Sequence, residues 1–506
     1  MTKNRSRGRS LKLNILTGLL QEVVALICGL ILPKLILARF GSEYNGVVNS
    51  IAQFLSFSVI LRSGLGAVTN AALYRPLAEG NVAKVSGIMV ATDRFMRKVA
   101  GLLGVLILGF ALIYPLMIEE FHYGFTFWLV VITGISTFAE NMVSVKYKII
   151  LQADQKYYIQ TFAAIIAQIL STVISVILIQ SGSGIHLTRL GAAVGLLTTP
   201  VFLKVYVHKH YDIDWTAPAD DIALQSRWDA FAQQLSLIVN NNVPTIIMTL
   251  MLPIKEVSVY SVYNMVVHNI RGLMANSIGG TVAAFGNMLA RCEYDHLRKR
   301  FGNVEFLIFS GTTLIYTTTA VLLMPFVLVY TRGIADAQYD RQWLGYVMVL
   351  ASALTILRLP YQMMSEAAGH FRQTRNGAIW EVVLHIVLSA VLAGTYGVTG
   401  VALGAFLSSL VRTVQLAWYA NRRILHLTMR YTIKNFIAFP AGGILIARGL
   451  PYFIDLNCSN YWEWFLSAFA VFCFASLTVA VLSVVFCPVQ SANIVRDFIM
   501  RKRMRK

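Results

Sequence analysis

Long apolar runs, separated by short polar segments, form the main pattern along this chain. A transmembrane helix needs about 20 mostly apolar residues to cross the hydrocarbon core of a bilayer. This length predicts an all-α polytopic membrane protein with about fourteen transmembrane helices. The predicted spans are 15–38, 45–73, 99–117, 124–146, 157–180, 185–206, 227–252, 257–290, 303–330, 343–367, 376–396, 398–420, 433–453 and 463–487.

The polar segments between the spans alternate in charge. One set is rich in Lys and Arg, while the other set is short and poor in cations. Basic loops mark the cytoplasmic side of a membrane, so both termini are expected in the cytoplasm. The basic segments are 3–12, 75–98, 146–156, 204–209, 291–300, 372–375, 422–434 and the tail RKRMRK.

Composition supports a membrane protein and excludes several other classes. Of the 506 residues, 57% are hydrophobic and 13% are charged, whereas a soluble domain is about a quarter charged. The net charge of +19 lies mostly between the spans, so no nucleic-acid partner is expected. Five cysteines without a CxxC spacing predict neither a metal site nor a disulfide framework. No phosphate loop or hydrolase motif is present, so we expect no enzyme activity and no cofactor.

The longest cytoplasmic segment follows six predicted spans and divides the chain. Transporters are often built from internal repeats, and GSEYNGVVNS, which opens the second span, is weakly similar to IKEVSVYSVYN, which opens the eighth. We therefore predict two six-helix lobes and an additional C-terminal helix pair. The expected parts are an N-terminal lobe at 1–210, a linker at 211–226, a C-terminal lobe at 227–425, and the helix pair with its basic tail at 426–506.

Arg271 lies near the middle of a predicted span. A charged side chain at the bilayer centre costs roughly 2.5–3.5 kcal/mol on insertion scales, so it rarely faces lipid. Asn264, His268 and Arg271 follow an i, i+4, i+7 spacing, which places them on one helix face. This face either lines a water-filled cavity that binds an anion or packs as a polar seam against another helix.

Arg358 lies inside another predicted span, close to a kink expected at Pro360. Two interpretations remain open for it. Arg358 either forms an internal ion pair with Glu366, two helical turns away, or faces a substrate. Arg412 is also within an apolar segment, nearer the predicted cytoplasmic end.

Further polar residues lie inside predicted spans. Arg62 does not share a helix face with nearby polar residues, so we expect a bend at Gly64–Gly66 or a separate role for Arg62. Lys34 either contributes to a binding cavity or extends toward the outer interface. Five amides precede Pro244 and either line a bent helix or bond to a neighbouring helix; they are Gln233, Gln234, Asn240, Asn241 and Asn242. Four acids also lie inside predicted spans: Glu22, Glu140, Glu366 and Glu381.

Three segments resemble a known transporter family. LILARFGSEYNGVVNSIAQFLS, RSGLGAVTNAALYR and the segment 371–414, with its short YGVTGVALG turn, are similar to polysaccharide transport proteins. This family contains O-antigen-type lipid-linked oligosaccharide flippases of the MOP exporter superfamily. Two positions depart from the family pattern. Many members have an acidic residue in place of Arg62, and Glu381 stands near a usual asparagine.

The resemblance implies a flippase that moves a polyprenyl-pyrophosphate-linked oligosaccharide across the bacterial inner membrane by alternating access. Its expected partners are this substrate, membrane lipids and, as a further candidate, a polysaccharide polymerase. Alternatives are a cation-coupled multidrug exporter of the same superfamily and a membrane assembly factor without transport. Candidate substrate-binding residues are Arg271, His268, Asn264, Arg62, Arg358, Lys34 and Asn241, and candidate ion-coupling residues are Glu22 and Glu366.

Overall fold

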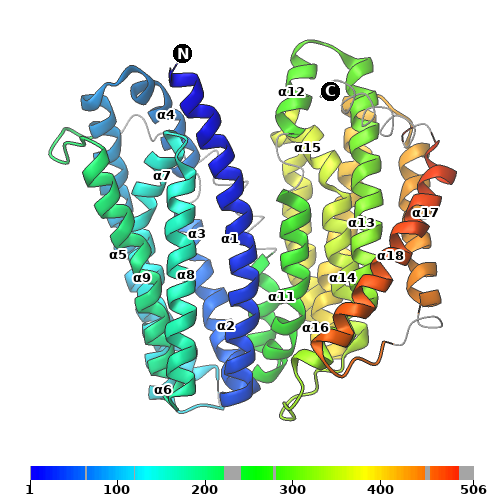
Figure 1. The fold of residues 1–506 in the computed structure, drawn as a ribbon, viewed down its shortest axis with the longest axis horizontal. Coiled ribbons are helices and arrows are strands. Elements are labelled where there is room, and N and C mark those ends of the chain that lie inside the picture. Colours follow the sequence, from blue (N-terminus) through cyan, green and yellow to red (C-terminus); the bar gives the residue numbers. More distant parts are fainter. Residues whose placement is uncertain are drawn as a thin grey trace. The chain divides into compact units, whose positions relative to one another are not determined.

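A computed structural model describes residues 2–62, 65–118, 120–220, 241–276, 281–450, 456–488 and 490. Within these residues the chain is helical and contains no strand, which confirms the predicted all-α fold. Ten helices of the described part are long and apolar enough to cross a membrane, as expected for a multi-pass membrane protein. The chain forms two compact units, 1–258 and 259–506 (Figure 1).

The first unit is a bundle of long helices with short connections (Figure 1). Helix α8 packs against both α1 and α9. Gly195 permits close packing, because an added Cβ there would lie 2.4 Å from the Ser171 Cα. The elements are α1 (Thr2–Phe40), α2 (Ser42–Ser56), α3 (Ser58–Leu61), α4 (Leu65–Glu79), α5 (Val82–Ile113), the 3₁₀ helix η1 (Tyr114–Leu116), α6 (Tyr123–Ala139), the π-helix η2 (Glu140–Ser144), α7 (Val145–Ala153), α8 (Tyr157–Gln180) and α9 (Ile185–His210).

Residues 241–251 are helical and belong to the first unit. Thr249 hydrogen-bonds to Ser50 of α2 at 2.8 Å, and Ser56 donates to Asn242 at 2.6 Å. These contacts explain why the chain leaves the first unit only after Ser258. The division of lobes at 211–226 stays a prediction.

The described part of the predicted linker packs against the first unit. The backbone N–H of Asp214 donates to Ser86 Oγ at 3.0 Å, and that of Asp220 donates to Gly87 O at 3.1 Å. The Tyr211 hydroxyl donates to Asp154 at 2.6 Å. Burial and this hydrogen bond both raise the pKa of Tyr211, so its hydroxyl stays protonated near neutral pH.

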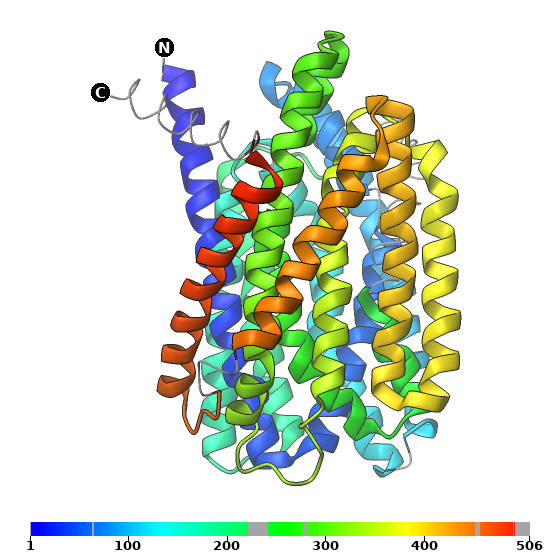
Figure 2. The ribbon, with the colours of Figure 1, turned by 90° about the vertical axis from the view of Figure 1, so that its right-hand side faces the viewer.

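The second unit is also helical, and α13 contacts α12, α14, α15, α17 and α18. Figure 2 shows α17 in orange and α18 in red, running beside α13. Gly443 allows α17 to approach, because a Cβ there would lie 2.6 Å from Thr317 Oγ1 of α13. The elements are α11 (Ile254–Asn276, with its first turn in the first unit), α12 (Thr281–Ala290), α13 (Tyr294–Tyr330), α14 (Gln342–Leu357), α15 (Leu359–Ala367), α16 (Phe371–Tyr419), the π-helix η4 (Ala420–Leu425), α17 (Met429–Gly449) and α18 (Tyr461–Phe486).

Helix α16 reverses direction at Gly397, where the backbone has φ 57° and ψ −138°. The sequence predicted two spans, 376–396 and 398–420, that meet at this glycine. The two arms run side by side in Figure 2. Small residues allow this packing, because a Cβ at Gly404 would lie 2.4 Å from Ser389 N. The Ser389 hydroxyl also donates to Val401 O at 3.0 Å, which joins the arms.

Candidate functional site

Arg62, Glu140 and Lys148 form the first charged group, inside the first unit. Glu140 Oε1 lies 2.5 Å from Lys148 Nζ and 4.0 Å from Arg62 Nη1. About a quarter of each side chain is exposed, at 25–27%. Two cations therefore share one carboxylate, which leaves this group with one excess positive charge.

Two interruptions of helical geometry place these side chains. Arg62 ends the short helix α3 with φ −107° and ψ 3°, and α2 has already ended at Ser56. The expected bend therefore begins before Gly64, which lies outside the described residues. Glu140 begins the π-helix η2, and single π-turns inside α-helices frequently occur at functional sites.

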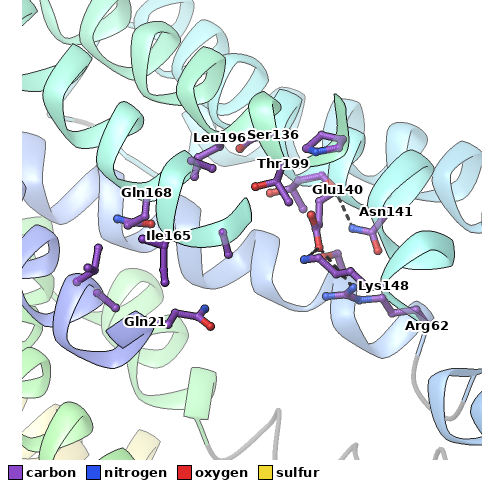
Figure 3. Close-up of a pocket in the computed structure, with 17 residues that line it drawn as sticks. Gln21, Arg62, Ser136, Glu140, Asn141, Lys148, Ile165, Gln168, Leu196 and Thr199 are labelled. Carbon is purple, nitrogen blue, oxygen red and sulfur yellow. Dashed lines mark hydrogen bonds and ion pairs between the residues drawn. The ribbon is translucent and has the colours of Figure 1, made fainter. Parts of the chain in front are cut away.

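A cavity of about 330 Å³ adjoins the first charged group. Figure 3 shows Arg62, Glu140 and Lys148 at one end and the amides of Gln21 and Gln168 at the other. An amide both donates and accepts hydrogen bonds, as sugar hydroxyls require. The cavity therefore combines a positive end with walls that mix neutral polar and apolar side chains.

Glu140→Gln is expected to weaken the first charged group by leaving Arg62 and Lys148 close together without their carboxylate. Since these side chains are only about a quarter exposed, the expected loss of stability is about 1–2 kcal/mol, between surface and buried ion pairs. Thermal denaturation of the purified protein measures it. Glu79→Gln is the control, because Glu79 pairs with Arg75 on an exposed surface. Equal thermal stability of the two variants would show that the first charged group does not stabilise the protein.

Arg358, Glu381 and Arg412 form the second charged group, inside the second unit. Arg358 Nη1 lies 2.5 Å from Glu381 Oε1, and Arg412 Nε lies 3.7 Å from Glu381 Oε2. The three side chains are only 9%, 5% and 11% exposed. Arg412 also donates to Thr374 O at 3.0 Å and to Gln415 Oε1 at 2.5 Å. Here too, two cations share one carboxylate.

The predicted Arg358–Glu366 ion pair is wrong. Arg358 lies between α14 and α15, at the break expected near Pro360. The first arm of α16 brings Glu381 to Arg358, while Glu366 accepts a hydrogen bond from Gln362 at 2.9 Å. Helical spacing within one span could not show which neighbouring helix supplies the nearer carboxylate.

Arg271 and His268 are adjacent on α11, as their spacing predicted. Arg271 Nη2 lies 2.9 Å from His268 Nδ1. Arg271 is half-buried, and Asn264 is half-buried one turn before His268. Arg358 lies close enough to Arg271 for the two cations to repel each other. Arg271 therefore extends the positive region around the second charged group.

The remaining predicted site residues belong to neither charged group. Lys34 is half-buried and Glu22 is exposed, both on α1. Asn241 is exposed, whereas its neighbour Asn242 is buried and bonded to Ser56. The amides of Gln233, Gln234 and Asn240 lie outside the described residues.

Sequence reasoning missed the roles of three residues in these groups. Glu140 and Glu381 were named among the acids inside predicted spans but not among the candidate site residues, yet each lies at the centre of its charged group. Lys148 was assigned only to a basic cytoplasmic loop. A carboxylate at the end of an apolar run was the available signal. Of the cationic partners, Arg62 and Arg358 come from other helices, Lys148 follows Glu140 in one continuous helical span, and Arg412 lies on the second arm of α16.

Comparison with known proteins shows the fold alone. No protein-family model matches the chain, and no curated protein sequence matches it. The lipid II flippase MurJ, in an inward closed conformation, superposes with a TM-score of 0.74 at 15% identity, covering 96% of this chain and 99% of MurJ. An inward-facing multidrug resistance MATE transporter of the MOP superfamily gives 0.66 at 15% identity, covering 80% and 94%. A MATE structure in the bent conformation gives 0.56 at 14% identity, covering 83% and 96%. The chain therefore has the fold of MurJ and the MATE transporters.

Proposed function

We propose that this protein is a flippase that moves a polyprenyl-pyrophosphate-linked oligosaccharide across the bacterial inner membrane for cell-surface polysaccharide export. One observation carries the proposal. In each unit, two interior cations share a single carboxylate, and Arg271 adds a further cation near the second group. Interior positive charge inside a multi-pass protein favours an anionic substrate. The fold shared with the lipid II flippase MurJ supports the same class of substrate.

Arg271 is the proposed main ligand of the pyrophosphate. The planar guanidinium of arginine makes two parallel hydrogen bonds to phosphate oxygens, which lysine cannot do. His268 and Asn264 lie on the same helix and would bind further oxygens. Arg358 is held by Glu381, so it contributes positive potential and helps to position the site.

The other parts of the substrate require different surroundings. Arg62 and the amide-lined cavity beside it offer a polar site for the glycan. Lys34 and Asn241 are proposed to bind the substrate from α1 and the helical segment 241–251. The lipid tail would remain in the bilayer, since its transfer into a polar cavity is unfavourable.

We place the termini in the cytoplasm, with a polysaccharide polymerase as a candidate partner.

A cation-coupled multidrug exporter is the second candidate, because two MATE structures share the fold. Such an exporter binds cationic drugs and needs carboxylates in its cavity. Each charged group has two cations for one carboxylate, and this excess of positive charge opposes the exporter, since like charges repel a cationic drug. Glu22 and Glu366 stay the proposed ion-coupling carboxylates for either function.

Transport by the full chain in vesicles separates the two candidates. The probe is a fluorescent polyprenyl-pyrophosphate disaccharide, and a membrane-impermeant quencher reports how much of it occupies the outer leaflet. We expect vesicles with the protein to exchange the probe between leaflets much faster than protein-free vesicles. A cationic dye serves as the drug control. Movement of the dye without movement of the probe would overturn the flippase proposal.

A further inference from the structure

A buried carboxyl lies outside both charged groups. Glu305 is in α13, and its residue is 1% exposed. Phe301 and Phe309, one turn before and one turn after it on α13, belong to the buried hydrophobic core of the unit. Neither charged group uses Glu305, and the proposed substrate site does not need it.

Three further polar residues surround this carboxyl, and we call these four residues the Glu305 cluster. The Tyr361 hydroxyl of α15 and the Thr432 hydroxyl of α17 both donate to Glu305 Oε1, the latter at 3.3 Å. The Asn421 amide of η4 donates to Thr432 Oγ1 at 3.0 Å. The cluster therefore joins four helical elements through one carboxyl group.

Cations on the neighbouring elements have other partners or face outward. Arg298, on the same helix, donates to Leu425 O at 2.9 Å, and Lys434 of α17 donates to Phe486 O at 2.8 Å. Among the described residues, no ion pair includes Glu305. The exposed cations nearby in sequence are Arg291, Lys299, Arg300, Arg422, Arg423 and Arg430.

Three other titratable side chains on or next to the adjoining elements bond to partners other than Glu305. Glu366 of α15 is bonded to Gln362, and His370, just after α15, contacts the Tyr419 hydroxyl at 3.0 Å. Cys487, after α18, contacts Asn435 Oδ1 at 3.5 Å. Two neutral hydroxyl donors, and no cation, therefore face the carboxyl within the described residues.

This surrounding favours a neutral carboxyl. An isolated carboxylate in an apolar interior is so costly that the group takes up a proton instead, unless a cation pairs with it. We propose that Glu305 is a proton-binding site, in which one proton adds to the carboxylate at Oε2 while Oε1 keeps the hydrogen bonds from Tyr361 and Thr432. Release of this proton leaves a buried charged carboxylate. Entry of water or a rearrangement of the four elements is then needed to stabilise its charge.

Helix packing in the second unit is therefore linked to proton binding at Glu305. Helix α15 begins just after the break at Arg358, and α17 begins shortly after η4, so the donors Tyr361 and Thr432 both lie in the first turn of their helices. If the chain transports a substrate, exchange of this proton would couple transport to a proton gradient. That last step rests on the proposed function, whereas proton binding itself does not.

Infrared difference spectroscopy of the purified full chain between acidic and alkaline pH tests proton binding without any substrate. We expect a carbonyl stretching band of a buried carboxylic acid that is absent in Glu305→Gln and shifted in Glu305→Asp. Glutamine keeps the acceptor oxygen and similar volume, so the fold should persist. Glu79→Gln is the control, because Glu79 is exposed and paired with Arg75, and it should leave the band unchanged. A band that survives in Glu305→Gln, or one displaced by sodium at constant pH, would overturn the proposal.

Transport in vesicles tests the coupling. With the fluorescent polyprenyl-pyrophosphate disaccharide, the wild-type rate should change by up to about tenfold per pH unit, as the occupancy of one proton site does. The Glu305→Gln rate should vary by less than about twofold over the same range. An unchanged pH dependence in this variant would reject coupling through Glu305. Failure of wild-type vesicles to move the probe would instead reject the proposed function, while the infrared result would stand.

Discussion

Replacing Arg271 with alanine is expected to weaken binding of a polyprenyl-pyrophosphate glycan by about 10- to 150-fold. A hydrogen bond to a charged group contributes about 1.5–3 kcal/mol, and about 1.4 kcal/mol changes affinity tenfold. Arg271 is half-buried and lies beside His268, in the positive region around Arg358. Binding of the fluorescent probe to the purified variant in detergent measures the change.

Two further variants sharpen this prediction. Arg271→Lys keeps the charge but loses the two-pronged geometry, so its affinity should fall between those of wild type and alanine. Arg372→Ala is the matched control, because Arg372 is an exposed arginine of the same unit. Wild-type affinity in Arg271→Ala, with normal thermal stability, would remove Arg271 from the proposed site.

Replacing Glu381 with alanine is expected to destabilise the protein by about 3–5 kcal/mol. Removal of one partner from a buried ion pair leaves an uncompensated charge in a medium of low dielectric constant. Here two cations, Arg358 and Arg412, would lose the same carboxylate, and both are about nine-tenths buried. The midpoint of thermal or chemical denaturation in detergent measures the loss.

Glu366→Ala serves as the control for Glu381→Ala. Glu366 is half-buried and bonded to the neutral Gln362, so its removal should lower stability much less. A Glu381→Ala, Arg358→Leu double variant should recover part of the loss, because one unpaired cation is then absent. Equal denaturation midpoints for the two single variants would contradict the assignment of Glu381 as the centre of this group.

The sequence predicted the features that depend on local spacing. Apolar run length predicted the all-α multi-span fold, and glycine in the YGVTGVALG turn marked the reversal within α16. The spacing of His268 and Arg271 predicted that they share one helix face, and the structure brings them into contact. Proline at position 360 indicated the break beside Arg358.

The sequence did not predict which residues meet across helices. Arg358 has Glu366 on its own span and Glu381 on another, and only the packing of α14 against α16 selects Glu381. Glu140 begins the π-helix η2 and Lys148 lies one turn beyond its end, so the two side chains meet. No residue pattern indicated this π-helix. Glu305 lies near the start of a predicted span, where an acid is ordinarily solvated, yet helices from three other segments surround it.

Transport of lipids that differ only in head-group charge tests the central claim most directly. The full chain in vesicles would be given polyprenyl-pyrophosphate, polyprenyl-monophosphate and uncharged polyprenyl versions of one fluorescent disaccharide. We expect the pyrophosphate lipid to cross fastest, the monophosphate more slowly, and the uncharged lipid no faster than in protein-free vesicles. Equal rates for all three lipids would contradict recognition of the substrate by interior arginine.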